Sequence, residues 1–583
     1  MTGRRVLSVL ALGLGMTAAL LWVLTRMPVE VQADSTTLYV SGKGGSDGGI
    51  LDPNNCTNVY KPCKTIQHAV DEATRGGRIF VTGGTYSDVH EREGVTQVVY
   101  LHRSVTIRGG YDFDFSEWDP ARHATILNAE EQGRVVYITE GVTPTLEALS
   151  LTDGKVTASG GGLYAASSSP RIDGCRIYSN TAGWYGGGVF LNETAGAVLR
   201  DSAIHDNRAD AAGGGVSISY GTDVTLTDND VHENHAHSGD GGGVQIRHVP
   251  SATLTDNSVS SNTAGGYGGG VYIYDSDHMV LEDNVICANA CGWSGGGLST
   301  GSIVTLIGNE IYSNTADGAG GGVDLRGNDH ATLVDNEIYS NTASSGGGVN
   351  TFNSPGIALV DNAIHHNTAT TSSGGGIRAT FTRLTVTRDA ILNNTSTDGG
   401  GGLFTYGSAL GLVNSIVAGN QITGTGAGIW AADTRVTLLH TTLACNEGGD
   451  GSGIWLKWSS VVSSMNTILV GHTLGITAAE GTTVTTEATL WGSGAWANGT
   501  DWTGQGAVAT GTVNVWGDPL FVDPASGDYH IGPGAAAGAG VDAGVTEDID
   551  GDSRPAPTGT NPDIGADEVA QCRVALPLVL RDL

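Results

Sequence analysis

Four polar or charged residues occupy related positions in a repeating sequence, and their side chains could act in acid–base chemistry or neutralise charge. Asp324, Asn350 and Arg378 each stand second in a short apolar segment after a glycine cluster, and Arg326 lies two residues after Asp324. A carboxylate could take or give a proton there, and a guanidinium could neutralise an acidic substrate group. Glycoside hydrolysis ordinarily needs two carboxylates, and this group has one. The four residues are our candidate catalytic residues, and proton abstraction is the chemistry they would support.

Aromatic side chains occupy the same position in the next three repeats. They are Phe404, Trp430 and Trp455, with Trp458 close behind. Sugar rings stack on such faces, so we predict a ligand-binding stripe. The alternative is that the stripe lies under a loop or that its rings stack on one another.

A column of aspartates precedes the asparagines of the repeat by six residues. Carboxylates ~4.8 Å apart would repel by about 0.9 kcal/mol per pair even in bulk water. We favour the interpretation that each accepts local backbone N–H bonds in a bend, and Ca²⁺ between repeats is the alternative. The column includes Asp201, Asp228, Asp256, Asp283, Asp335 and Asp361, with Gly308 in the same place.

Two independent markers define the repeat that must position these side chains. Glycine clusters recur every 25 to 28 residues from Gly160 to Gly400, and a column of asparagines keeps the same step. Two markers with one period indicate a true repeat architecture. The asparagines are Asn180, Asn207, Asn234, Asn262, Asn289, Asn314, Asn341, Asn367, Asn394, Asn420 and Asn446.

Each repeat predicts three short strands and leaves no room for a crossover helix. Alternating apolar residues follow the glycines, as in Val271–Tyr274, and two further apolar runs precede the asparagine. A unit of this length makes one turn of an all-β parallel β-helix, a solenoid whose coils stack ~4.8 Å apart. The second residue of the strand after the glycines should then point to solvent and lie above its counterpart one coil away. Asparagine and glycine suit bends with positive φ, and stacked asparagines can hydrogen-bond along the column.

The ends of the solenoid require caps. The segment 64–73 is amphipathic and predicts a helix over the first coil. We divide the chain into an exported or anchoring N-terminal segment, a cap with first coils, regular repeats, closing coils and a short apolar tail. These parts span residues 1–33, 34–128, 129–470, 471–570 and 571–583.

Composition excludes several classes of protein. The chain of 583 residues has 91 glycines, 28 Lys+Arg and 60 Asp+Glu, giving a net charge of −32. Such a surface repels nucleic acids and anionic lipids, so we expect no nucleic-acid partner. The hydrophobic share of 39% is enough for a buried core.

The N-terminus and the cysteines indicate export. Arg4 and Arg5 precede the apolar run 6–24, which is typical of a signal peptide; a retained anchor is the alternative. We predict disulfides from the short spacings of two pairs, Cys56 with Cys63 and Cys287 with Cys291. Zinc is disfavoured, because the spacings differ and no histidine array accompanies them. Three cysteines have no assigned partner: Cys175, Cys445 and Cys572.

Several motifs carry a resemblance to known proteins. The pairing of Gly320–Val323 with Ile338–Asn341 resembles the repeat of chlamydial-type polymorphic outer-membrane proteins. With the opening Leu38–Val40 and the ending Asp563–Glu568, the chain resembles secreted right-handed parallel β-helix proteins of the pectin-lyase-like superfamily. The resemblance implies a right-handed, single-stranded solenoid, and it leaves function open because that superfamily includes lyases, hydrolases and adhesins.

Two functions follow from these observations. The first is a secreted or cell-surface protein, monomeric and without a cofactor, whose rigid face serves adhesion, polysaccharide or cell-surface glycan binding, or envelope structure. The second is a polysaccharide lyase or hydrolase acting at the group around Asp324. Calcium is an additional ligand to test for either function.

Overall fold

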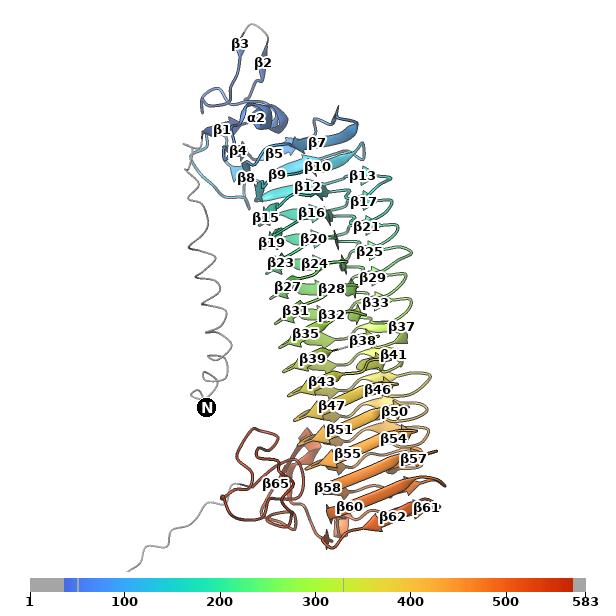
Figure 1. The fold of residues 1–583 in the computed structure, drawn as a ribbon. Helices are drawn as coiled ribbons and strands as arrows, with labels where there is room; N and C mark the ends of the chain where they lie inside the picture. Colours follow the sequence, from blue (N-terminus) through green and yellow to red (C-terminus); the bar gives the residue numbers. More distant parts are fainter. Residues whose placement is uncertain (1–35, 50–51, 329, 570–583) are drawn as a thin grey trace, which may run out of the picture.

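The computed structural model describes residues 36–49, 52–328 and 330–569, which form one long solenoid of stacked coils (Figure 1). A regular coil contains four strands rather than the three predicted. The additional strand follows the asparagine and is often only two residues long, too short to show alternation. One coil comprises β38 (Val323–Arg326), β39 (Ala331–Val334), β40 (Glu337–Tyr339) and β41 (Thr342–Ser345).

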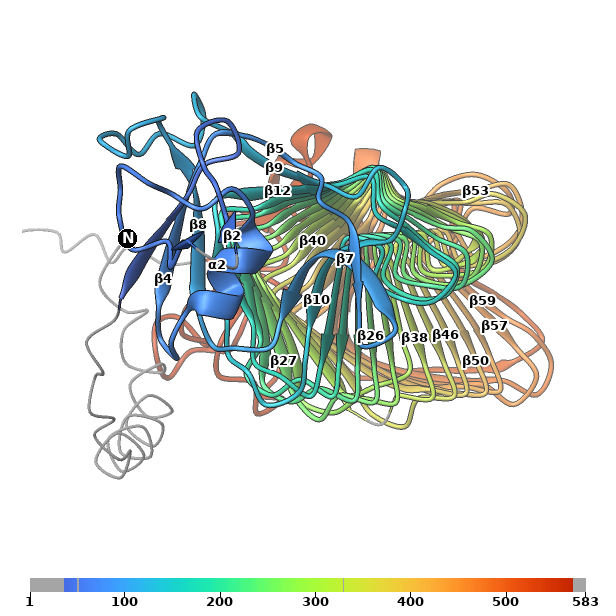
Figure 2. The ribbon, with the colours of Figure 1, turned by 90° about the horizontal axis from the view of Figure 1, so that it is seen from above.

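Each strand pairs in parallel with its counterpart in the next coil, which builds three long sheets. Sheet 1 takes two strands from each coil, such as β39 and β40; sheet 2 takes strands such as β38, and sheet 3 takes strands such as β41. Viewed from above, the coils lie behind one another (Figure 2). The regular strands of sheet 2 are β14 (Leu163–Ala166), β18 (Val189–Asn192), β22 (Val216–Ser219), β26 (Val244–Arg247), β30 (Val271–Tyr274), β34 (Leu298–Thr300), β38, β42 (Val349–Phe352), β46 (Ile377–Thr380), β50 (Leu403–Tyr406), β54 (Ile429–Ala432) and β57 (Ser452–Lys457).

The register of sheet 2 confirms the predicted vertical columns. Asp324 pairs with Asn350, which pairs with Arg378, and the column continues through Phe404 and Trp430 to Trp455. The first and third residues of these strands point inward, because the side chains of a strand alternate between its two faces. Most of them are apolar and join one continuous core, while Thr300, Thr351 and Thr405 are buried polar residues.

Asparagines form a buried ladder along the solenoid, as predicted. From Asn180 to Asn446, each side-chain N–H donates to the next asparagine oxygen at 2.9 to 3.1 Å. A second ladder, missed in the sequence, runs between the two strands that each coil contributes to sheet 1. It consists of Asn229, Asn257, Asn284, Asn309, Asn336 and Asn362, and it ends on Asp389.

The helix expected near the N-terminus is α2 (Ile66–Glu72). Thr65 begins it by accepting a hydrogen bond from the backbone N–H of His68 at 3.2 Å. Its apolar residues are buried, and the helix contacts β1 (Thr37–Val40), β4 (Arg78–Thr82) and β7 (Val95–Leu101) at the first end of the solenoid (Figures 1 and 2).

The closing segment folds back against the outside of the last coils (Figure 1). Tyr529 and Ile531 from β65 (Asp528–Ile531) pack on an apolar patch that includes Ile468 and Leu490. Arg554 is buried beside them and donates to three backbone carbonyls, and its guanidinium lies 3.3 Å from the Glu568 carboxylate. The segment therefore covers the flank of the solenoid.

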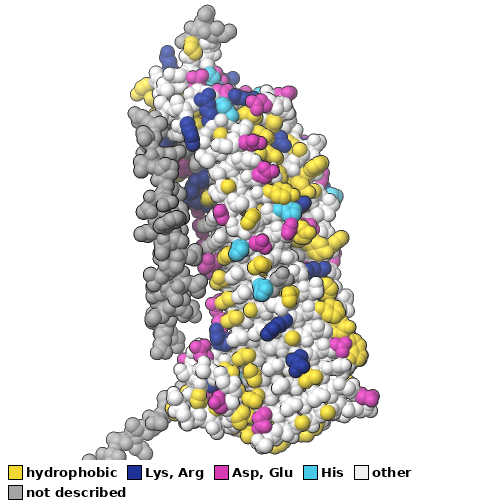
Figure 3. Space-filling view, viewed as in Figure 1, with side chains coloured by type: hydrophobic (Ala, Val, Ile, Leu, Met, Phe, Trp, Pro, Cys, Tyr) yellow, Lys and Arg dark blue, Asp and Glu magenta, His cyan; other side chains and the backbone are white. Residues whose placement is uncertain are grey.

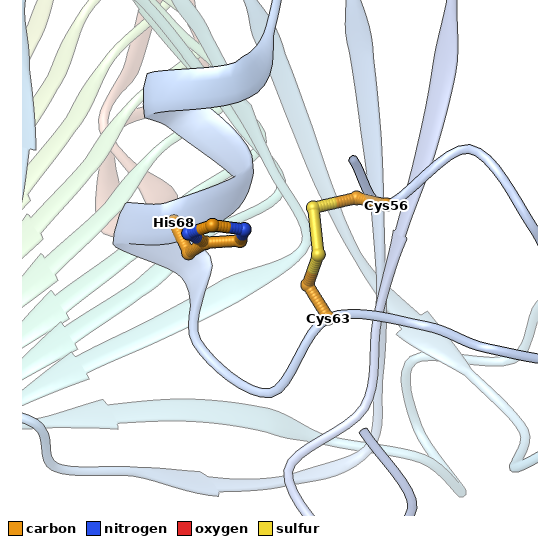
Figure 4. Close-up of side chains that lie close together, drawn as sticks. All are labelled: Cys56, Cys63 and His68. Carbon is orange, nitrogen blue, oxygen red and sulfur yellow. A yellow bond between two sulfur atoms is a disulfide. The ribbon is translucent and has the colours of Figure 1, made fainter. Parts of the chain in front are cut away.

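One predicted disulfide is confirmed and the other is wrong. Cys56 and Cys63 are bonded, with the ring of His68 nearby (Figure 4). Cys287 and Cys291 are both free, because the Asn289 ladder turn separates their strands and Cys291 packs in a column of alanines. Burial raises the pKa of the Cys291 thiol to about 12.

Some predictions lie outside the described residues. These are the N-terminal segment 1–33 and the tail 571–583, and Cys572 also lies outside the described residues. Among the residues that are described, no helix has the length and apolar character needed to cross a membrane.

Candidate functional site

The second residues of the sheet 2 strands lie on the outer face of the sheet, but only half of them reach solvent as predicted. Half of the column from Tyr164 to Trp455 is buried, including Asp324 at 0% exposure and Asn350 at 1%. The glycine segment preceding each strand folds over it. A Cβ on Gly320 would lie 2.8 Å from the Cβ of Asp324, and its φ is +67°. The glycines therefore allow a close cover that the sequence pattern alone did not show.

The candidate catalytic residues form a closed hydrogen-bonded chain. Asp324 accepts from Asn350 Nδ2 at 2.6 Å, from Arg326 Nε at 2.7 Å and from Ser299 Oγ at 3.3 Å. Arg378 donates to Asn350 Oδ1 at 3.0 Å. The register thus brings together all four residues singled out in the sequence.

This chain is poorly suited to proton transfer with a substrate. Burial raises the pKa of Asp324, although Arg326 and the hydrogen bonds from Asn350 and Ser299 oppose the shift. Both carboxylate oxygens already have donors, and Arg326 is held by Ser294 Oγ at 2.6 Å. No oxygen of Asp324 faces solvent, so a substrate proton has no route to it in this conformation.

The aromatic stripe is stacked on itself. The rings of Phe404 and Trp430 lie 4.4 Å apart and 13° from parallel, and those of Trp430 and Trp455 lie 5.4 Å apart and 14° from parallel. Both faces of Trp430 are therefore covered by neighbouring rings. A Cβ on Gly399 would lie 3.2 Å from the Phe404 ring, so the loop also approaches the stripe. The stripe presents ring edges rather than open faces.

A second aromatic group, which the sequence analysis missed except for Trp458, lies at the corner where sheet 2 turns into sheet 1. We call Phe352, Phe381, Tyr406 and Trp458 the corner ridge. Their rings meet edge to face in sequence, at 6.2, 5.2 and 5.6 Å. Phe352, Phe381 and Trp458 are 42%, 51% and 47% exposed. Hydrophobic side chains gather along one edge of the solenoid in Figure 3.

Small residues let the ridge rings from different coils meet. Tyr406 pairs with Thr380 on one side and with Ala432 on the other, so neither neighbour blocks its ring. Phe381 lies over Gly407, where an added Cβ would come within 2.6 Å of the ring. A search for aromatics at strand ends one period apart, with glycine or alanine between them, could have found this group.

Two ridge residues have an unusual backbone conformation. Phe381 and Trp458 have φ of +52° and +57°, in the left-handed region that bulky residues rarely adopt. The same corner position in neighbouring coils is occupied by Asn353, Gly407 and Asp433. These residue types adopt the left-handed backbone conformation more easily than Phe or Trp. Each bulky residue therefore costs about 1–2 kcal/mol of backbone strain.

The aspartate column also marks left-handed turns. Asp201, Asp228, Asp256 and Asp283 have φ between +49° and +56° and are exposed. The expected side-chain bonds to local backbone N–H groups are not observed for these four residues, so the turn itself explains the residue type. Within the described ranges, the groups of three ligand atoms within 4.8 Å of one another include none of these carboxylates.

Two other clusters have metal-ligand side chains. Cys56 and Cys63 lie near His68, but the cysteines form a disulfide and His68 Nε2 bonds to the Asn54 carbonyl at 2.7 Å (Figure 4). The second cluster is His530, Asp550 and Asp567, in which His530 lies 3.0 Å from Asp550; its other ring nitrogen lies 2.6 Å from Asp528. Burial lowers the pKa of His530, but its hydrogen bond to Asp528 and the charges of Asp550, Asp567 and Asp528 outweigh burial and raise the pKa overall. Both clusters are explained by bonds within the protein.

Stacked parallel coils, buried asparagine ladders and a continuous apolar core define a parallel β-helix. A family model described as "Right handed beta helix region" matches residues 121–268, 242–409 and 321–490, so the chain belongs to this family. No curated protein sequence matches the chain. A crystal structure of pectate lyase Pel9A matches with 10% identity and a TM-score of 0.23, over 91% of this chain and 96% of that one.

Proposed function

We propose that the protein is a secreted or cell-surface β-helix protein that binds polysaccharide without cleaving it. The corner ridge is the observation that carries this proposal. Four aromatic rings cross five neighbouring coils, and three of them are substantially exposed. Export is supported by the basic and apolar residues of the N-terminal segment, and the likeness to polymorphic outer-membrane repeats supports a surface location.

The ridge does not have the properties of a stabilising core. Its rings remain in solvent, so they gain little from burial, and two of them occupy a strained corner. Edge-to-face contacts cover less ring-face area than the parallel stack of the neighbouring stripe, and three of the four ridge residues keep substantial exposure. Open aromatic faces in a row suit the flat apolar faces of sugar rings. The half-buried stripe of Phe404, Trp430 and Trp455 would support the ridge from the adjacent column of sheet 2.

Catalysis by a lyase or hydrolase is the second candidate. One observation favours it: burial raises the pKa of Asp324, as in many catalytic acids and bases. The closed hydrogen-bonded chain around this carboxylate argues for a structural role instead.

The test is retention on immobilised neutral and acidic polysaccharides, with released products assayed in parallel. A Phe381→Asn, Trp458→Asn double variant should lose retention at least tenfold while keeping its circular dichroism spectrum. Tyr220→Asn is the matched control, because Tyr220 is also an exposed aromatic with φ of +55° but lies outside the ridge. New reducing ends or unsaturated products would contradict a non-catalytic role. Absence of retention on every polysaccharide would contradict binding.

The proposal includes a capping role for α2. Its buried apolar face lies against β1, β4 and β7, where it would protect the first coil from edge pairing with another chain. The proposed function requires neither a cofactor nor a second copy of the chain.

A further inference from the structure

Resting on the proposed function, we infer that the corner ridge takes an anionic polysaccharide, whose acidic groups meet cations on both flanks of the ridge. Arg383 and Arg435 begin β47 (Arg383–Thr387) and β55 (Arg435–Leu439) of sheet 1, two residues after the corner. Both are exposed, and both pair in register with Ala409 in the coil between them. They therefore form a short column of positive charge along one side of the ridge.

Arg378 lies on the other flank, on sheet 2, two residues before the strand-end column, and Lys457 continues that column two coils beyond Tyr406. The ammonium of Lys457 lies 5.2 Å from the centre of the Trp458 ring and 5.8 Å from that of Trp455. Arg378 lies 5.9 Å from the centre of the Phe404 ring. Cations and aromatic faces thus alternate across these coils.

The clustering is notable because cations are scarce in this part of the chain. Residues 327–553 contain five Lys or Arg, and four of them are Arg378, Arg383, Arg435 and Lys457. Within the described residues, none of these four forms an ion pair with a carboxylate. The fifth, Arg388, is paired with Asp361 at 2.6 Å.

Carboxylates near the ridge do not neutralise the cluster. Asp433 holds the corner between the ridge residues, where it accepts from the Ser459 backbone N–H at 3.4 Å, and Glu480 follows one coil beyond Trp458. Asp324 also acts on Arg378, but it is already paired with Arg326 at 2.7 Å. Four cations against two remaining carboxylates leave a local positive surface on a chain of net charge −32. Screening limits the influence of the distant negative charge to about 8 Å at physiological ionic strength, so the local charge decides which ligand binds.

The geometry also sets the direction of the ligand. The ridge runs from β42 to β57, a rise of four coil steps or about 19 Å along the solenoid axis. A polymer lying along this axis contacts Phe352, Phe381, Tyr406 and Trp458 in turn. Arg383 and Arg435 lie on one side of it, Arg378 lies on the other, and Lys457 lies beside Trp458 at the end of the ridge. Affinity should therefore rise with chain length until the ligand spans the ridge.

The experiment compares alginate, hyaluronate and polygalacturonate with the same polymers after chemical reduction of their carboxyl groups. We expect at least one acidic polymer to bind at least tenfold more tightly than its reduced form, with affinity falling between 0.15 and 1 M salt. An Arg383→Gln, Arg435→Gln, Lys457→Gln triple variant should lose this preference and most of the salt dependence. Lys155→Gln is the control, because Lys155 is an exposed cation in a distant coil that is already paired with Glu131. Its substitution should change neither the preference for acidic polymers nor the salt dependence.

The outcomes separate this inference from the proposed function. Equal binding of acidic and reduced polymers, or unchanged preference in the triple variant, would overturn the inference and leave polysaccharide binding intact. Binding of neutral polymers alone would also overturn the inference and leave polysaccharide binding intact. Absence of binding to any polymer, acidic or neutral, would overturn both. Circular dichroism and the denaturation midpoint of the triple variant show whether a loss arises from misfolding.

Discussion

Asp389 offers a sharp test of the buried ladders, because it holds a carboxyl group where six preceding coils hold asparagine. Its Oδ1 accepts from the backbone N–H and side-chain amide of Asn362 at 2.5 and 2.8 Å, and its Oδ2 accepts from the Thr387 N–H at 3.2 Å. The residue is 0% exposed. Burial raises its pKa from 3.8 to about 7, against the effect of these hydrogen bonds.

The sign of the pH effect follows from the raised pKa. Below pH 3.8 the carboxyl is protonated in both the folded and the unfolded chain. Between 3.8 and about 7 only the unfolded chain loses the proton, so stability falls as pH rises. At 1.36 kcal/mol per pKa unit, the loss by neutral pH is about 4 kcal/mol. Asp389→Asn removes this titration and retains the acceptor oxygen for Asn362.

Denaturation by guanidinium at several pH values measures the effect. The stability of Asp389→Asn relative to the unmodified protein should rise by about 4 kcal/mol from pH 4 to pH 8. The lost Thr387 bond shifts the whole curve without changing its slope. Asp335→Asn, an exposed change two coils before Asp389, is the control and should give a flat difference. A difference for Asp389→Asn that stays within about 1 kcal/mol across this range would refute the reasoning.

Three further predictions concern the ladders, the corner and metal ions. Asn314→Ala leaves the Asn289 backbone N–H and side-chain amide without their acceptor, so we expect the free energy of unfolding in denaturant to fall by about 3–5 kcal/mol. Thr315→Ala, at the exposed neighbouring residue, should lower it by less than about 1 kcal/mol. Equal effects of the two substitutions would contradict the ladder's role. Phe381→Asn and Trp458→Asn should each change stability by less than about 1 kcal/mol, because relief of the left-handed strain offsets the lost ring contacts; a larger loss would make the ridge structural. EDTA and added Ca²⁺ should leave the Tm unchanged, and a calcium-dependent rise would support ions between the aspartates of successive coils.

The repeat period in the sequence was sufficient to predict which residues become vertical neighbours. Glycine and asparagine columns with one step implied stacked coils, and the register of Asp324, Asn350 and Arg378 agrees with that prediction. The second ladder was also visible in principle, since Asn229 and its counterparts directly follow most members of the aspartate column. Local spacing carries this information because each coil pairs with the same residues of the next.

Only the tertiary structure decided which members of each column reach solvent. The glycine segment covers Asp324 and approaches Phe404. The residues of the strand beneath give no sign of this cover, because their alternation is the same whether or not another segment crosses them. The corner ridge likewise joins residues from two different columns, strand-end Tyr406 and corner residues Phe381 and Trp458. Their rings meet because glycine and alanine leave space in the coils between, and that space depends on how the chain turns in three dimensions.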